Sequence, residues 1–299
     1  HAALYGDGAA VVCFFGINLF GAKNRNGGRS QMKKKIGLLG CGALGKAFLE
    51  LMEKKLSAQY ETAGIFDGMP EYARAYGKEH GYPVFETLEE LLDAQPDIVV
   101  EFASVEAVRE YGPAVLKAGI SLVTASVGAF ADGDFLEEMK RTAQAAGVKI
   151  YVPSGAIGGF DVMRTLAQEE GAEVKIVNRK APESLAGAPY LEGKTLSDKE
   201  ETLIFSGNAL EAIRAFPKNV NVAVAAATAV EGPEKAKVEV WSVPGLSCNT
   251  HVIHVKNSLA MANMEISSLP DPKNPRSSVI AAWSAVALLE NLTSPMQFF

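Results

Sequence analysis

Cysteine and histidine are scarce in this sequence. Its 299 residues include three cysteines, Cys13, Cys41 and Cys248, and four histidines. The cysteines form no C-x-x-C pair and no spacing typical of metal ligands, so we predict neither a disulfide framework nor a metal site. A sparse, odd number of cysteines is typical of proteins with reduced thiols, which leads us to expect a cytoplasmic location.

An excess of basic residues and a long hydrophobic run are also missing. The formal net charge is -6 and the pI is near 5.4, with no basic stripe, which argues against nucleic acid as a partner. The apolar segment 9–20 is interrupted by Gly16 and Asn18 and is shorter than the roughly 20 residues needed to cross a bilayer. We therefore predict no membrane partner.

Residues 1–31 differ in character from the rest of the chain. No cationic region precedes the apolar segment 9–20, which weakens a secretory-signal interpretation, and residues 23–30 are typical of a flexible polar linker. We interpret residues 1–31 as an upstream extension or a cloning-derived linker, with a targeting segment as the alternative.

A glycine-rich turn organises the sequence that follows. The apolar run ending at Leu39 meets Gly40, Gly42 and Gly45, spaced G-x-G-x-x-G, and good helix formers such as Ala43 and Leu44 continue from it. Strand, turn and helix start together predict a dinucleotide-binding site at Gly40, Gly42, Ala43, Leu44 and Gly45, with the pyrophosphate at the helix N-terminus. The alternative is a strand–helix turn that binds no ligand.

An acidic residue ends the next predicted strand. Asp67 follows the apolar segment 60–66, about 20 residues after Gly45, where a carboxylate binds the adenosine ribose in this kind of site. No arginine follows to receive a 2′-phosphate, so we expect NAD as the cofactor in preference to NADP, although NADP stays possible. The alternative role of Asp67 is a helix cap or a turn.

The segment up to residue 159 alternates between strands and helices, which predicts a doubly wound parallel sheet. Ligands bind at the carboxyl ends of such strands, where three loops stand out: Ala103-Ser104, residues 126–129 with Ser126 and Gly128, and residues 154–159 with Ser154 and Ala156. We expect strands at 35–39, 60–67, 83–85, 97–102, 120–124 and 148–152, and helices at 43–55, 70–80, 87–94, 105–118 and 132–147.

The pattern changes after Gly159, where consecutive strands with short connections predict a mixed or antiparallel sheet. The expected strands are 173–180, 202–206, 236–243, 249–256 and 259–267, the helices 160–169, 208–216, 221–230 and 277–291, and the loop 181–200. The predicted fold class is therefore α/β, a Rossmann domain with a second α+β domain. We predict a dinucleotide-binding domain at 32–155 plus the C-terminal helix 276–299, and a substrate domain at 156–275.

One predicted strand carries two histidines. His251 and His254 lie three positions apart on it, so their side chains point to opposite faces and cannot form a two-histidine metal site. At most one faces a cleft. On pattern alone, either one is as well explained as a satisfied or exposed strand residue.

Six segments, in this order, carry a family resemblance. From about Lys33 onward the chain resembles the L-aspartate dehydrogenase family in the segments Gly40–Gly45, Ser126–Asp132, Ser154–Asp161, Phe216–Ala223, Asn249–His251 and Asn274–Ser278. The resemblance implies NAD(P)-dependent oxidative deamination of L-aspartate to iminoaspartate, which hydrolyses to oxaloacetate and ammonia, and the reverse reductive amination. It also implies a role in NAD biosynthesis and a homodimer.

The resemblance assigns roles to particular residues. His251 is expected to be the acid/base residue, and Ala156 and Asn221 to contact the cofactor, as we also expect of Ala103, Ser126 and Gly128. Candidate partners for the substrate carboxylates are Ser154, Arg179, Lys180, Lys218, Asn219 and Arg276. Each of these cations is equally well explained as a surface charge, and Asn219 as a helix cap.

Two alternatives to this function stay open. One is another two-domain NAD(P)-dependent dehydrogenase, with homoserine-like substrates. The other is a regulator that binds a nicotinamide nucleotide without turnover.

Overall fold

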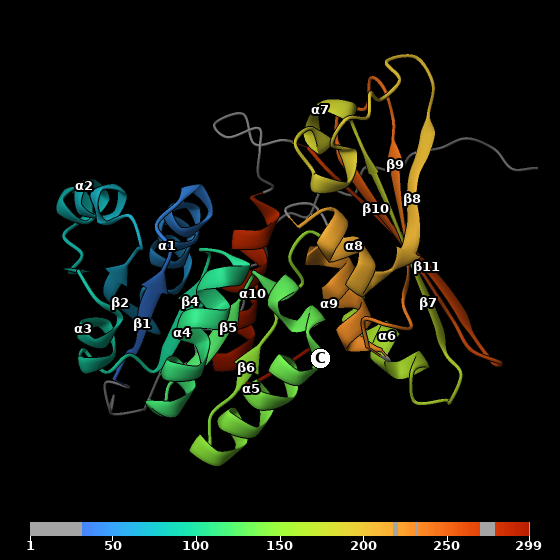
Figure 1. The fold of residues 1–299 in the computed structure, drawn as a ribbon. Helices are drawn as coiled ribbons and strands as arrows, with labels where there is room; N and C mark the ends of the chain where they lie inside the picture. The colour runs from blue at the N-terminus through green and yellow to red at the C-terminus, as the bar shows by residue number, and fades with distance from the viewer. Residues whose placement is uncertain (1–31, 218–220, 231, 270–278, 299) are drawn as a thin grey trace, which may run out of the picture. The chain divides into compact units, whose positions relative to one another are not determined.

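The computed structural model describes residues 32–217, 221–230, 232–269 and 279–298. Residues 32–299 form one compact unit. Within it, two sheets organise the chain (Figure 1). No helix among the described residues is long and apolar enough to cross a membrane.

The first sheet has six parallel strands in the order β3-β2-β1-β4-β5-β6, the order of a Rossmann fold. Its strands are β1 (Lys34–Leu39), β2 (Tyr60–Phe66), β3 (Val84–Phe85), β4 (Ile98–Glu101), β5 (Ser121–Thr124) and β6 (Ile150–Tyr151). The connecting helices are α1 (Ala43–Leu56), α2 (Pro70–His80), α3 (Leu88–Asp93), α4 (Val105–Lys117) and α5 (Gly133–Ala146), with a 3₁₀ turn η1 (Val127–Ala131). The predicted parallel, doubly wound sheet is confirmed.

The second sheet is mixed and has the order β11-β10-β7-β9-β8. Strands β7 and β9 are parallel and the other pairs are antiparallel. The strands are β7 (Glu173–Lys180), β8 (Thr202–Asn208), β9 (Lys237–Ser242), β10 (Asn249–Lys256) and β11 (Met261–Ser268). The helices of this part are α6 (Phe160–Leu166), α7 (Pro182–Leu185), α8 (Ala209–Ala215) and α9 (Asn221–Ala229), with a 3₁₀ turn η2 (Pro189–Leu191).

Segment 181–200, predicted as a loop, contains two short helical pieces. Helix α7 and turn η2 each begin with a proline, and they bury Leu185 and Leu191. Proline fits the first position of a helix because its fixed φ is helical and its missing N–H would be unpaired there anyway. Elements of three or four residues are too short to show a hydrophobic period, so the sequence pattern could not reveal them.

The C-terminal helix α10 (Ile280–Thr293) packs on the first sheet. It buries Ala282, Ala285, Val286 and Leu289 in the apolar cluster that contains α1 and α2, and the Tyr60 hydroxyl donates to the Leu289 carbonyl oxygen at 2.9 Å. The other face of that sheet, with α3, α4 and α5, belongs to a second cluster that continues into the second sheet. The two sheets therefore share a core, and the boundaries near residues 155 and 276 stay predictions.

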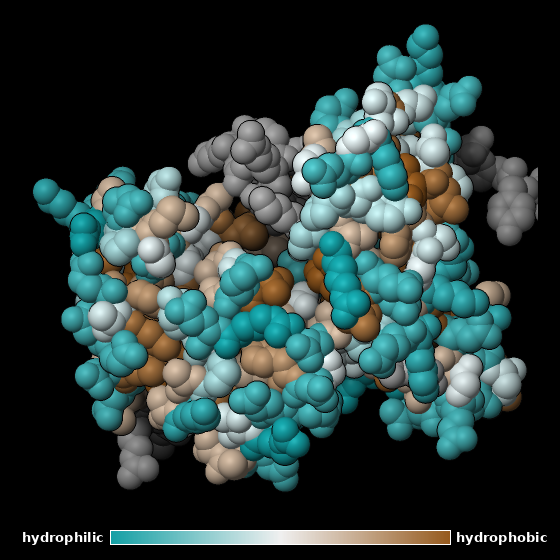
Figure 2. Space-filling view, viewed as in Figure 1, coloured by the Kyte–Doolittle hydropathy of each residue, from teal (hydrophilic) through white to brown (hydrophobic). Residues whose placement is uncertain are grey.

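The exterior is mixed in character. Hydrophilic side chains cover most of the face in Figure 2, and hydrophobic ones show in scattered groups. Among the described residues, exposed large apolar side chains include Leu259 and Met261 at the β10–β11 turn and Trp283 on α10.

Candidate active site

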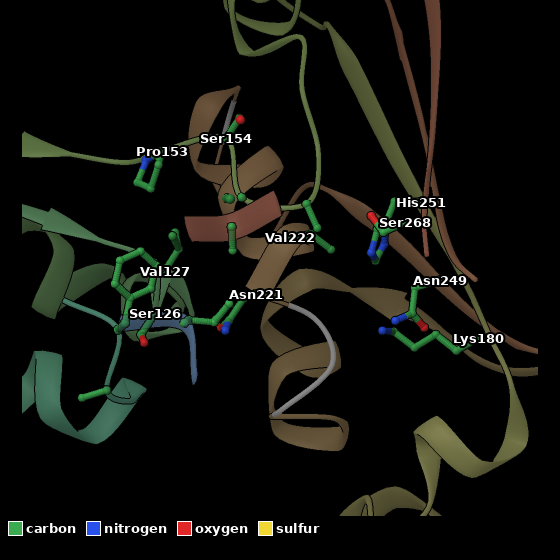
Figure 3. Close-up of a pocket in the computed structure, with 18 residues that line it drawn as sticks. Ser126, Val127, Pro153, Ser154, Lys180, Asn221, Val222, Asn249, His251 and Ser268 are labelled. Carbon is green, nitrogen blue, oxygen red and sulfur yellow. The ribbon is translucent and has the colours of Figure 1, made fainter. Parts of the chain in front are cut away.

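A cavity of about 310 Å³ opens between the carboxyl ends of β4 and β5 and one end of the second sheet (Figure 3). It is lined by Leu44, Phe102, Ala103, Ala125, Ser126, Val127, Pro153, Ser154, Gly155, Ala156, Lys180, Asn221, Val222, Ala225, Asn249, His251, Ser268 and Ala281. Residues that are far apart in the sequence therefore line the same cavity.

The glycine turn has three positions with three different steric requirements. Gly40 has a φ of +95°, and a Cβ there would come within 2.7 Å of the Ala103 backbone nitrogen. A Cβ on Gly45 would collide with the Gly40 carbonyl oxygen, whereas one on Gly42 would meet nothing within 4 Å. Gly42 is thus the position where backbone is open to a ligand, at the start of α1, which suits a dinucleotide pyrophosphate.

Asp67 lies beside this turn. Its carboxylate accepts from the Cys41 backbone nitrogen at 2.6 Å and from the Met69 backbone nitrogen at 2.8 Å. A carboxylate has about four acceptor sites but no donor, so these two bonds leave lone pairs available for the hydroxyls of a ribose. Asp67 therefore stabilises the turn and keeps acceptor capacity for a ligand.

A buried carboxyl group ties together two loops that line the cavity. Glu101 ends β4, is 0% exposed, and accepts from the Ala103 nitrogen at 2.7 Å and the Thr124 hydroxyl at 2.6 Å. It also accepts from the Ser126 nitrogen at 3.1 Å and the Ser126 hydroxyl at 2.7 Å. Burial raises the pKa of Glu101 above its ordinary value, although the four donors oppose that rise.

Asn221 connects the two parts of the site. It begins α9, and its side-chain oxygen accepts from the Gly128 backbone nitrogen at 3.1 Å, which fixes α9 against the loop that follows β5. Gly128 itself does not line the cavity, but Asn221 does.

His251 reaches the cavity from the second sheet. It is 3% exposed, and its Nδ1 lies 2.8 Å from the side-chain oxygen of Asn178, the residue directly opposite on β7. An amide oxygen can only accept, so Nδ1 carries the proton and Nε2 keeps its lone pair. Burial, and then the nearby charge of Lys180, lowers the pKa of His251 to about 3, so the ring is neutral near pH 7.

Lys180 is the only charged residue that lines the cavity among the described residues. It ends β7, is 7% exposed, and its ammonium group makes no hydrogen bond or ion pair with any described residue. Burial lowers its pKa to about 8, so its ammonium group is still mostly charged near pH 7.

The predicted site residues fall into four groups. Leu44, Ala103, Ser126, Ser154, Ala156, Lys180, Asn221 and His251 line the cavity; Gly40, Gly42, Ala43, Gly45, Asp67 and Gly128 form the turn and loop beside it. Arg179 is instead on the opposite face of β7, where its guanidinium pairs with Glu201. Asn219, Arg276 and Lys218 are outside the described residues.

The prediction that His251 and His254 point to opposite faces of one strand is confirmed. It lies on the opposite face of β10 from His251, and its Nδ1 is 2.7 Å from the side-chain oxygen of Asn263.

Several residues of the site were not predicted. Asn178, Asn249 and Ser268 lie on strands of the second sheet, and Glu101 ends a strand of the first. The signal that identifies them is a polar residue at the end of an apolar, inward-facing series, such as Val174, Ile176, Asn178 and Lys180 along β7.

A six-stranded sheet of Rossmann order, an open glycine turn and a cavity with a buried neutral imidazole define the class of nicotinamide-dinucleotide-dependent oxidoreductases. The comparisons agree. Residues 40–153 match the family described as homoserine dehydrogenase, NAD binding domain, and residues 161–292 match aspartate dehydrogenase, C-terminal.

Relatives extend over nearly the whole chain. The L-aspartate dehydrogenase of Methanosarcina barkeri is 37% identical over 268 residues, 88% of this chain and 98% of its own, and that of Methanocaldococcus jannaschii is 33% identical over 264 residues, with the same shares. The crystal structure of aspartate dehydrogenase from Thermotoga maritima has a TM-score of 0.69 at 27% identity, covering 90% of this chain and all of that one. This chain belongs to the aspartate dehydrogenase family.

The fold is shared more widely. A hyperthermophilic archaeal homoserine dehydrogenase in complex with NADPH has a TM-score of 0.51 at 17% identity, covering 89% of this chain and 100% of that one. At that identity the likeness concerns the fold alone.

Proposed function

We propose that this chain is an L-aspartate dehydrogenase that uses NAD. L-Aspartate, NAD⁺ and water give oxaloacetate, ammonium, NADH and a proton, and the reverse reaction aminates oxaloacetate. The observation that carries the proposal is that His251, a buried and neutral imidazole, opens on the same cavity as the loops of the dinucleotide-binding sheet.

The residues that would hold the dinucleotide are those of the first sheet. Gly40, Gly42 and Gly45 shape the turn, Asp67 would bind the ribose, and the loops at Ala103, Ser126 and Ala156 lead from the turn toward the cavity, with Leu44 and Asn221 beside them. When bound, the cofactor supplies the hydride acceptor for oxidation at Cα.

NAD is the proposed cofactor, in preference to NADP. The Asp67 carboxylate would repel a 2′-phosphate, and the residues that follow it, Gly68, Met69 and Pro70, offer no cation to bind one. A higher kcat/KM with NAD than with NADP is the expected result.

His251 would move the protons. Its neutral Nε2 can take a proton from the water that attacks the imine carbon and return it to the departing ammonia, while Asn178 holds the Nδ1 proton. Positioned acid–base groups of this kind contribute roughly 10²–10⁴-fold to the rate.

Lys180 and the loop at Ser154 would bind the substrate carboxylates, because both line the cavity. The roles predicted for Asn219 and Arg276 stay predictions. A homodimer and a cytoplasmic location are likewise expected from the resemblance and from the low cysteine content.

The substitution His251→Ala tests the proposal. We expect kcat for L-aspartate to fall at least about 100-fold, with NADH binding nearly unchanged, because the ring acts on the proton and not on the dinucleotide. The matched control is His254→Ala, on the other face of the same strand, which should retain full activity. Turnover by His251→Ala at the wild-type rate, measured by NADH absorbance, would exclude this role.

A further inference from the structure

The inward face of the second sheet changes character along its strands. On β7 it runs from Val174 and Ile176 to Asn178 and Lys180, and on β10 it runs from Val255 and Ile253 to His251 and Asn249. Strands β9 and β11 likewise end in Ser242 and Ser268 after apolar inward residues. One end of this face is therefore polar, and at this end Lys180, Asn249, His251 and Ser268 line the cavity, whereas Ser242 does not.

The residues at this end of the four strands, which are the last of β7, β9 and β11 and the first of β10, lie in one row. Lys180 is paired with Ser242 on β9, and Asn249 is paired with Ser268 on β11. Because Thr250 is opposite Arg179 in the antiparallel β7–β10 pair, Asn249 is opposite Lys180. We call Ser242, Lys180, Asn249 and Ser268 the polar row; Figure 3 shows Lys180 and Asn249 side by side with Ser268 nearby.

The polar row has unused hydrogen-bonding capacity. The hydroxyl oxygens of Ser242 and Ser268 are buried, at 1% and 2% exposure of these residues, and neither has a hydrogen-bond partner in the described part of the chain. The Lys180 ammonium group has no hydrogen-bond or ion-pair partner there either, and no described residue that lines the cavity carries a carboxylate. Leaving a cation and hydroxyls buried without partners is unfavourable, so the row is built for a ligand that supplies negative charge.

The distance between the polar row and His251 indicates which of the two substrate carboxylates the row would bind. The polar row lies two residues beyond His251 along the strands, on the order of 6–7 Å. The α-carboxylate is bonded to the carbon at which His251 would act, whereas the side-chain carboxylate is one methylene farther away. The longer reach favours the side-chain carboxylate.

We propose that the polar row binds the side-chain carboxylate of the substrate and thereby selects a dicarboxylic amino acid. This rests on the proposed function, because it assigns the selectivity of the same site. In the row, the Lys180 ammonium pairs with the carboxylate, and the Ser268 hydroxyl and the Asn249 amide can donate to it.

The ratio of kcat/KM for L-aspartate to that for L-asparagine tests this assignment in wild type and Lys180→Met. L-Asparagine has nearly the same shape but no side-chain charge. We expect Lys180→Met to lower kcat/KM for L-aspartate about 100-fold and that for L-asparagine less than about threefold, so the ratio collapses. An equal fall for both substrates would overturn the assignment, because Lys180 would then bind the α-carboxylate or serve the chemistry.

Lys175→Met is the matched control, since Lys175 lies on the same strand but on its other face, paired with Glu239. It should leave the ratio unchanged. Ser268→Ala should lower the ratio by about tenfold, the value of one hydrogen bond to a charged group.

Binding of succinate, a dicarboxylate without an amine, gives a measurement independent of turnover. It should raise the melting temperature of the wild type but not of Lys180→Met, which should itself melt higher without ligand because an unpaired buried charge is gone. Equal stabilisation of both proteins by succinate would overturn the assignment. Succinate binding that needs Lys180, in an enzyme that oxidises no L-aspartate, would contradict only the proposed function.

Discussion

At the scale of single residues, Asn178 determines which ring nitrogen of His251 carries the proton. Its side-chain oxygen holds the Nδ1 proton at 2.8 Å, and its side-chain nitrogen is buried without a partner in the described residues. Replacing that nitrogen with a carboxylate oxygen, as in Asn178→Asp, therefore breaks no hydrogen bond. What changes is the charge beside the ring.

The variant Asn178→Asp should move the pH dependence of the enzyme. In the wild type, burial lowers the pKa of His251 to about 3, below the ordinary 6.5, so acidification to pH 5 does not protonate the ring. A carboxylate in contact with Nδ1 stabilises the imidazolium and raises that pKa. We expect kcat/KM to begin falling at least about one pH unit higher on the acid side than in the wild type.

The control for this shift is Asn178→Leu, which removes the acceptor without adding charge. It should lower kcat without moving the acid limb upward, because the ring loses its fixed orientation but gains no anion. Identical pH profiles for the wild type and Asn178→Asp would show that His251 does not carry the titrating proton.

At the scale of elements, the loops after β4 and β5 depend on Glu101. Each of its two carboxyl oxygens accepts from one backbone N–H and one hydroxyl. One oxygen accepts from the Ala103 N–H and the Ser126 hydroxyl, and the other accepts from the Ser126 N–H and the Thr124 hydroxyl. A glutamine side chain in the same place would put an NH₂ group where one carboxyl oxygen is. The neighbouring hydroxyl could rotate and accept from this NH₂ group, but the neighbouring backbone N–H can only donate and would lose its acceptor.

The variant Glu101→Gln should therefore lose stability and cofactor affinity together. We expect a loss of about 1–3 kcal/mol in the free energy of unfolding, the cost of one unsatisfied buried donor, and weaker NADH binding because Ala103 and Ser126 shift. Urea unfolding and NADH fluorescence titration measure the two effects. Glu138→Gln, on the exposed surface of α5, is the control, and a Glu101→Gln protein with unchanged values in both would refute this role.

The elements also show where sequence reasoning succeeds. Strand β7 and helix α1 were predicted within a residue, because alternation and helical periodicity are local properties. The roles of Gly40 and Gly45 followed from spacing for the same reason, since each constraint acts within a few residues.

The parts that sequence did not reveal depend on register between distant segments. Asn178 faces His251 and Asn249 faces Ser268 only once β7, β10 and β11 are aligned, and a shift by one residue would turn each side chain to the other face. Arg179 and Lys180 illustrate this: both were candidates for the same role, yet adjacent strand positions place one on the outer face and the other in the cavity.

At the scale of the whole molecule, the two sheets share one apolar cluster. It includes Leu39 and Val99 of the first sheet, Phe130 of the turn after β5, and Ile176 and Val240 of the second sheet. Such continuity couples the unfolding of both parts, although the sequence pattern divides them near residue 155.

Leu289→Ala tests this coupling. Leu289 is fully buried on α10, in the cluster on the other face of the first sheet, which contains no residue of the second sheet. Removing its side chain should cost about 2–5 kcal/mol and lower the melting temperature by several degrees. Because the shared cluster links the sheets, we expect a single calorimetric transition that moves as a whole, while Trp283→Ala, 52% exposed on the same helix, moves it little. Two transitions, of which only one is lowered, would show instead that the sheets belong to domains that unfold independently.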